Sequence, residues 1–155
     1  MKKYIGLFLL FSLIFAIWSP PAFSGEAMPA PDFNLSDLDN KSFTLSSYKG
    51  RQSVILLFWT TWCPYCRGEL KTINQMSEDL KNKKMEVLAI NIGESLPVVS
   101  KFIKSLNFTY PVLLDQNARV AKSYGVFGVP TYVIIDDQGN IFRQENYFPK
   151  DVFKK

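Results

Sequence analysis

The two cysteines of this 155-residue chain are the residues best suited to chemistry. Cys63 and Cys66 are its only cysteines, and two residues separate them directly after an apolar run. A pair with this spacing can cycle between dithiol and disulfide and exchange electrons with other disulfides. The spacing therefore predicts a redox centre that works by thiol–disulfide exchange.

The residues around the pair predict which sulfur attacks. Residues 54–59 are rich in β-branched and aromatic side chains, as strands are, and an apolar pattern with helical period begins after Cys66. Pro64 suits the first position of a helix and makes Cys63 its N-cap. Free backbone N–H groups and the helix dipole then favour the Cys63 thiolate and lower the pKa of that thiol. We expect Cys63 to attack and the more buried Cys66 to resolve the mixed disulfide.

Two other uses of paired cysteines fit the sequence less well. A purely structural bridge across so short a loop removes little entropy from the unfolded chain. A structural zinc site needs four ligands, and the chain has neither a third cysteine nor any histidine. We therefore expect no metal and no dissociable cofactor, the redox-active disulfide being sufficient.

The N-terminus predicts the compartment. Lys2 and Lys3 precede an uncharged apolar stretch, residues 4–18, and the small residues Ala22 and Ser24 follow. This order is typical of an export signal that is cleaved after Ser24 or three residues further on. A retained membrane anchor stays open, although the apolar stretch is short for a spanning helix. The sequence therefore predicts an extracytoplasmic protein.

The rest of the chain has the size of one domain. We predict that residues 1–24 are a signal peptide or an N-terminal membrane anchor and that residues 25–155 form a single domain. The precursor has a formal charge of +4, and loss of its two N-terminal lysines leaves sixteen basic residues against fourteen acidic ones. So mild a charge does not indicate nucleic-acid binding. We also expect the protein to be a monomer.

Strand and helix patterns alternate along this domain. Short hairpins are predicted around residues 39–41 and 136–140, and one helix with apolar positions from Leu70 to Leu80 follows the cysteines. This order indicates an α/β fold with a mixed sheet covered by helices. The further strands are expected at 86–92, 112–114, 131–135 and 141–145, and the further helices at 95–106 and 118–124.

Four motifs together resemble the exported TlpA/ResA/DsbE-like branch of the thioredoxin superfamily. They are residues 30–33, 59–66, 91–95 and 128–131. W-C-x-x-C after a strand, with V-P-T before a later strand, is specific, and the resemblance spans roughly residues 30 to 146. It implies a thioredoxin-like fold with a short N-terminal β-hairpin, and the activity of a thiol–disulfide oxidoreductase.

The resemblance also implies a substrate-binding surface. Pro130 is expected to be cis and to lie against the disulfide, while the backbone of Val129 pairs with an extended substrate segment. Base rates alone would make Pro130 an ordinary trans proline that opens a strand. Trp62, Pro64 and Tyr65 complete the expected surface, because an exposed aromatic rim suits docking to an apolar peptide.

Glu69 follows Cys66 by three residues and matches the acidic position of the CxxCxxE motif in ResA-like reductases. One helical turn brings its carboxylate near Cys66, where it can accept the proton that Cys66 loses, and its charge raises thiol pKa values. The alternative is a carboxylate in the first helical turn that only complements the helix dipole. Cytoplasmic thioredoxins carry a buried aspartate at the position of Leu57, so Glu69 is the better acid–base candidate here.

The resemblance implies partners as well. The substrates are expected to be protein disulfides, those of apocytochrome c among them. Because an oxidising compartment supplies no reductant, a membrane electron donor of the DsbD/CcdA type is expected to keep the pair reduced.

Several alternatives stay open at this point. The dipeptide Pro64-Tyr65 is typical of glutaredoxins, so an oxidase, an isomerase or a glutathione-linked enzyme also fits. From another class, a non-catalytic binding module or Cu(I) carrier fits the fold, although two thiolates would be the whole copper site. A peroxidase is disfavoured, because its P-x-x-x-T-x-x-C pattern needs proline at Leu56. Few residues follow 145, so we expect one face of the sheet to be thinly covered or covered by another protein.

Overall fold

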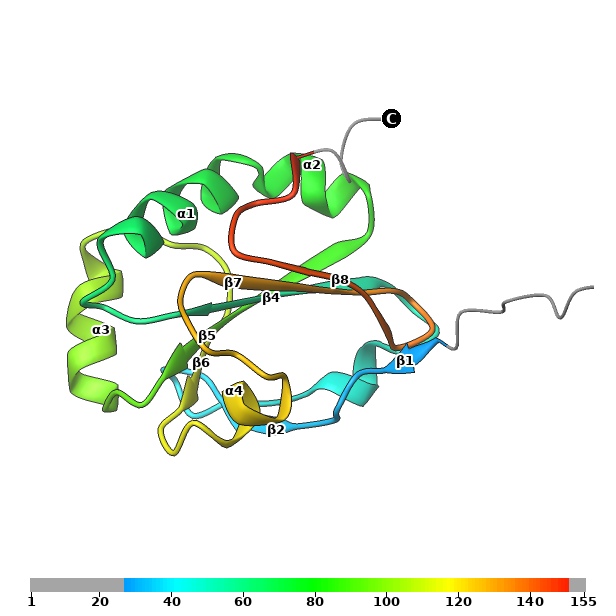
Figure 1. Ribbon diagram of the computed structural model, residues 1–155. Helices are drawn as coiled ribbons and strands as arrows, with labels where there is room; N and C mark the ends of the chain where they lie inside the picture. Colours follow the sequence, from blue (N-terminus) through cyan, green and yellow to red (C-terminus); the bar gives the residue numbers. More distant parts are fainter. Residues whose placement is uncertain (1–26, 151–155) are drawn as a thin grey trace, which may run out of the picture.

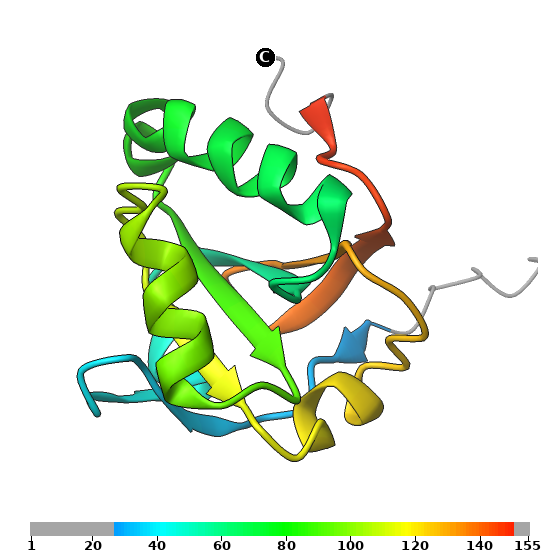
Figure 2. The ribbon, with the colours of Figure 1, turned by 90° about the vertical axis from the view of Figure 1, so that its left-hand side faces the viewer.

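The computed structural model describes residues 27–150. The predicted signal or anchor, residues 1–24, lies outside the described residues, as do residues 151–155. In the described part a six-stranded mixed sheet carries helices on both faces, and a two-stranded sheet lies beside its β6 edge (Figure 1). The second view shows α1 and α3 together on one side and α4 on the other (Figure 2). The predicted mixed sheet flanked by helices is therefore present.

The central sheet combines parallel and antiparallel pairs. Its strand order is β1-β8-β7-β4-β5-β6, with β4, β5 and β6 parallel to one another and the remaining pairs antiparallel. The bounds are β1 (Met28–Pro29), β4 (Ser53–Trp59), β5 (Met85–Ile92), β6 (Val112–Asp115), β7 (Thr131–Ile135) and β8 (Asn140–Glu145). The pairing of β1 with β8 is an addition to the sequence-based prediction, which expected only an extended lead-in there.

The central strand β4 explains why this sheet forms. Its side chains from Val54 to Trp59 are all buried, as expected for a strand that is covered on both faces. Leu57 and Trp59 pack into the core below α1, whereas Leu56 and Phe58 pack into the core beside α4. The cysteine loop thus begins at the end of the most deeply buried strand.

The helices are distributed over both faces. The elements are η1 (Leu45–Tyr48), α1 (Pro64–Gln75), α2 (Ser77–Asn82), α3 (Leu96–Lys104) and α4 (Arg119–Ser123). The prediction of a single helix from Leu70 to Leu80 is wrong, because the helix is interrupted at Met76. The Met76 N–H is shared between the carbonyls of Thr72 and Ile73, and a new helix starts at Ser77 with two acidic residues in its first turn.

The predicted N-terminal hairpin is present as β2 (Asn34–Ser36) and β3 (Ser42–Thr44). Asp37 closes its turn, because its Oδ1 accepts hydrogen bonds from the backbone N–H groups of Asp39 and Lys41. Asp37 also forms an isolated antiparallel bridge to Leu113 in β6. This bridge attaches the hairpin to the edge of the main sheet.

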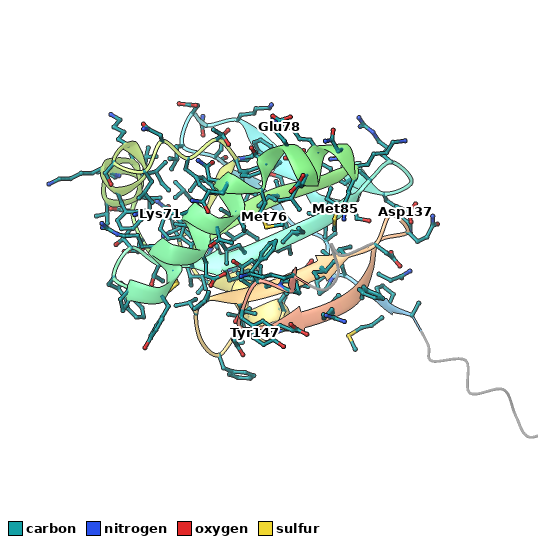
Figure 3. All side chains as sticks on the ribbon, turned by 90° about the horizontal axis from the view of Figure 1, so that it is seen from above. Lys71, Met76, Glu78, Met85, Asp137 and Tyr147 are labelled. Atoms are coloured by element: carbon teal, nitrogen blue, oxygen red, sulfur yellow. A yellow bond between two sulfur atoms is a disulfide. The ribbon has the colours of Figure 1, made fainter. Side chains whose placement is uncertain are left out.

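The face that carries α1 is unevenly covered. Seen from above, α1 and α2 lie over the middle of the sheet, and in the described part no helix lies over β7 and β8 (Figure 3). The chain after β8 supplies the cover instead. Phe148 is buried and packs edge-on against the ring of Tyr132 in β7, with 5.7 Å between the ring centroids. The cover on this side is therefore thin, as expected, because an aromatic contact stands where a helix could lie.

Buried tyrosines make the fold sensitive to alkaline pH. Burial raises the pKa of Tyr110 to about 12 and also raises the pKa values of Tyr48, Tyr124 and Tyr132 above 10.0. Their contribution to stability is fully present below pH 10 and is lost as the pH rises through the folded-state values, because the unfolded tyrosines ionise first. We expect the free energy of unfolding of the oxidised protein to fall from about pH 10 upward, as denaturant titrations will measure. A Tyr124→Phe variant should show a shallower fall, and an equally steep fall in that variant would contradict this.

Candidate active site

The disulfide lies where β4 gives way to α1. Cys63 is the N-cap of α1 and Pro64 its first residue, as predicted. Cys63 and Cys66 form a disulfide, with 5.4 Å between their Cα atoms. The Cys66 backbone N–H donates a hydrogen bond to Cys63 Sγ at 3.1 Å. This N–H and the helix dipole both stabilise negative charge on Cys63, which supports its prediction as the attacking sulfur.

Both cysteines are buried in the disulfide form. Cys63 is 3% exposed and Cys66 is fully buried. The order of burial agrees with the prediction that Cys66 is the more buried, although Cys63 is almost as enclosed. The reason is the neighbouring loop, because the Val129 carbonyl oxygen lies 3.7 Å from Cys63 Sγ.

The Val129–Pro130 peptide bond is cis, as the resemblance implies. A disulfide sulfur carries no hydrogen, so the 3.7 Å approach of Val129 O is a contact here and can become an S–H hydrogen bond after reduction. Asn146 fastens the loop, since its Nδ2 donates to the carbonyl oxygen of Pro130 at 3.1 Å and to Thr131 Oγ1 at 3.0 Å. The structure thus places Val129 and Pro130 beside the cysteines, and their binding of substrate stays a prediction.

Glu69 lies one helical turn after Cys66 and has a partner that the sequence did not reveal. Tyr132 Oη donates a hydrogen bond of 2.6 Å to Glu69 Oε2. Tyr132 is fully buried in β7, and its pKa is raised first by burial and then by this hydrogen bond. The alternative of a dipole-complementing glutamate is wrong, because α1 has no acidic residue in its first turn and the dipole effect fades beyond it. Its role as proton acceptor for Cys66 stays a prediction.

A second carboxylate holds the loop that leads to Cys63. Glu94 Oε2 accepts hydrogen bonds of 2.7 Å from the Thr61 backbone N–H and from Asn91 Nδ2, and Glu94 Oε1 accepts one of 2.6 Å from Thr61 Oγ1. Asn91 is fully buried in β5. Residues 91–95 carried part of the family resemblance, but no role had been assigned to Glu94. The signal was an asparagine and a glutamate three positions apart at the end of an apolar strand.

Comparison with known proteins places this site in a family. Residues 27–144 match the AhpC/TSA family. The thiol-disulfide oxidoreductase ResA of Geobacillus thermodenitrificans is 34% identical over 145 residues, which cover 91% of this chain and 83% of that protein. The chain belongs to the AhpC/TSA family and is a ResA/DsbE-like member of the thioredoxin superfamily. Leu56 still stands where the peroxidase pattern needs proline.

Two further comparisons agree with this ResA/DsbE-like assignment. ResA of Bacillus subtilis is 36% identical over 118 residues, which cover 76% of this chain and 65% of that protein. A crystal structure of a Chlorobium tepidum protein provisionally named thiol:disulfide interchange protein DsbE superposes with a TM-score of 0.74 at 32% identity. That superposition covers 81% of this chain and 88% of the other. The predicted thioredoxin-like fold is confirmed, and the ResA/DsbE-like chain is a thiol–disulfide oxidoreductase.

Exposed aromatic side chains lie close in sequence to the disulfide of this ResA/DsbE-like domain. Trp62 is 72% exposed and Tyr65 is 79% exposed, as predicted, whereas Trp59 is fully buried. Phe127 is fully exposed as well and was missed by the sequence analysis. Its signal was a phenylalanine between two glycines, shortly before Pro130.

Two negative findings apply to the described part of this ResA/DsbE-like chain. Within residues 27–150, no helix has the length and the apolar character needed to span a membrane. The same residues contain no group of three or more histidine, cysteine, aspartate or glutamate side chains that could hold a metal ion.

Proposed function

We propose that this ResA/DsbE-like protein reduces protein disulfides outside the cytoplasm, with the cysteines of apocytochrome c as the substrate class. The observation that carries the proposal is the cysteine pair itself, with Cys63 at the N-terminus of α1 and the cis Val129–Pro130 bond beside it. The ResA relatives support thiol–disulfide exchange, and the predicted export signal supports the compartment.

The reaction follows from the positions of the two sulfurs. The Cys63 thiolate attacks one sulfur of the substrate disulfide, forms a mixed disulfide and releases the other substrate sulfur as a thiolate, which takes up a proton. Cys66 then loses its proton to a base and attacks Cys63 Sγ, which releases the second substrate thiolate. Two electrons have passed to the substrate, and the Cys63–Cys66 disulfide of the structure is the product. Glu69 is the proposed base, because it follows Cys66 by one helical turn.

The surface around the disulfide supports a peptide substrate. Trp62 and Tyr65 expose large aromatic side chains next to the cysteines in sequence, and Phe127 exposes another, two residues before Val129. Such surfaces favour extended apolar segments. The Val129 carbonyl oxygen beside Cys63 is an acceptor with which an extended backbone can pair. An unfolded or partly folded protein presents both features, and a small disulfide does not.

Regeneration needs a reductant, because the compartment is oxidising. A membrane dithiol protein of the DsbD/CcdA type is the proposed donor, and residues 1–24 are the proposed signal or anchor that brings the chain to it. The two sulfurs carry the electrons, so the proposal includes no dissociable cofactor. The chain is proposed to act as a monomer.

The reduction potential of the Cys63–Cys66 pair tests the direction of electron flow. We expect titration of the full-length protein against a defined thiol–disulfide buffer to give a value near or below about −250 mV, as a dedicated reductant requires. A value above about −180 mV would contradict a reductase and favour an oxidase or isomerase, as the dipeptide Pro64-Tyr65 allows. Since no other cysteine is present, the signal reports this pair alone.

A further inference from the structure

The two oxygens of Glu69 are used unequally. Oε2 accepts the 2.6 Å hydrogen bond from Tyr132 Oη, whereas no hydrogen bond from residues 27–150 reaches Oε1. Glu69 lies three residues after Cys66 on α1, and side chains at this spacing share one helix face. Oε1 is therefore the oxygen that is available to the Cys66 proton.

Tyr132 is fixed from several sides. In β7 it pairs with Leu57 of β4 and with Glu145 of β8, and its side chain is fully buried. Phe148 packs edge-on against its ring at 5.7 Å between centroids. Burial raises its pKa, so the phenol stays protonated and donates at every pH at which the folded protein works. The hydroxyl is thus a permanent donor that has little freedom to turn away from Glu69.

We propose that Tyr132 is a positioning residue: its hydroxyl holds Glu69 Oε2, so that Oε1 faces the Cys66 proton during resolution of the mixed disulfide. The inference rests on the proposed function, in which Glu69 takes that proton. As the Cys66 sulfur bonds to Cys63 Sγ and the substrate thiolate leaves, the proton passes from Cys66 to Glu69 and then to solvent water. No further oxidant or reductant is needed, because Tyr132 only orients the acceptor.

Other charges around this pair are few and can be held constant. Arg67 and Lys71 lie on α1 with Glu69, and both are exposed. Glu145 lies opposite Tyr132 on β8 and forms an ion pair with Arg143 at 3.5 Å. A variant that removes only the Tyr132 hydroxyl leaves all four in place, so a changed pH profile reports on Glu69.

The test compares two buried tyrosines. Tyr132→Phe removes the hydroxyl at Glu69, and Tyr124→Phe is the matched control. Tyr124 is 5% exposed, lies in the core on the opposite face of the sheet, and donates a 2.7 Å hydrogen bond to the carbonyl oxygen of Pro31. Both variants therefore lose one buried tyrosine hydroxyl and its hydrogen bond, but only one of these hydroxyls touches the proposed base.

The readout is the rate at which Cys66 displaces thionitrobenzoate from Cys63 in the full-length protein, measured by stopped flow across pH. We expect Glu69→Gln to slow this step about a hundredfold near neutral pH, because a general base is lost. Tyr132→Phe should slow it about tenfold through misplacement of that base, and should change the pH profile. Tyr124→Phe should match the wild type. In the Glu69→Gln background, Tyr132→Phe should have no further effect.

The inference is overturned if Tyr132→Phe resolves with the rate and the pH profile of the wild type. It is also overturned if Tyr132→Phe slows resolution equally in the wild-type and the Glu69→Gln backgrounds. If Tyr132→Phe does not fold, Glu69→Asp replaces it, since the shorter side chain withdraws the carboxylate from an intact tyrosine. That variant should also resolve slowly, and a wild-type rate would overturn the inference. If Glu69→Gln resolves normally, the inference fails while dithiol exchange stands. If the wild type forms no mixed disulfide, the proposed function itself fails.

Discussion

Replacing Cys63 by serine is expected to slow disulfide reduction at least about a thousandfold, because a serine hydroxyl cannot supply the nucleophile that a thiolate supplies. Cys66→Ser should retain the attack and lose the resolution. It is therefore expected to accumulate mixed disulfides, in which Cys63 is bonded to client proteins or to a model disulfide. Reductase assays with a protein disulfide and non-reducing electrophoresis measure the two effects.

The paired variants also test the assignment of roles. Cys63 is the N-cap of α1, and its sulfur accepts a hydrogen bond from the Cys66 N–H, whereas Cys66 lies within α1 and is fully buried. If Cys63→Ser formed the mixed disulfides and Cys66→Ser did not, the assignment of attacker and resolver would be reversed. If neither formed them under conditions in which the wild type is active, exchange through this pair would be excluded. Circular dichroism of both variants is the control for folding.

Trp59→Ala is expected to cost about 3–5 kcal/mol in the free energy of unfolding of the oxidised protein. Trp59 ends β4, is fully buried, and packs on Phe102 of α3 with 5.4 Å between ring centroids. It belongs to the same core cluster as both cysteines, so the cavity left by its removal lies in the core that holds the disulfide. Urea titrations followed by circular dichroism measure the loss.

Trp62 provides the matched control for that prediction. It lies three residues after Trp59 and is 72% exposed, so Trp62→Ala should change stability by no more than about 0.5 kcal/mol. The same variant should weaken binding of a protein substrate, if the proposed aromatic surface is correct. Equal losses of stability in the two variants would contradict the placement of Trp59 in the core and of Trp62 on the surface.

Most of the fold was predictable, because its elements have strong local signals. These signals come from residues that are neighbours in the sequence. Examples are the continuous apolar run of β4, the turn at 136–140 and the proline near the start of α3. The break at Met76 was missed because Leu70, Ile73 and Leu80 are buried on both sides of it, so the apolar period continues across two helices. The pairing of β1 with β8 joins residues more than a hundred positions apart and has no local signal.

The site divides in the same way. Cys63, Cys66 and the helix start at Pro64 could be assigned from spacing alone. Glu69 could be proposed as their acid–base partner, but not the tyrosine that holds it, which lies sixty-three positions further along the chain. Glu94 holds Thr61 across thirty-three positions. The burial of Cys63 depends on Val129, sixty-six positions away.

The sequence by itself determined that this chain has one redox pair, where that pair caps a helix, and which strand leads into it. These features arise from contacts between residues within about one helical turn, and such contacts depend on residue type and spacing. Only the tertiary structure decided which side chains surround the pair. β4 pairs with β5 in parallel, which brings the Glu94 segment beside the end of β4, and it pairs with β7 in antiparallel, which brings Tyr132 into the core below α1. That pairing is set by burial of both faces of the whole sheet.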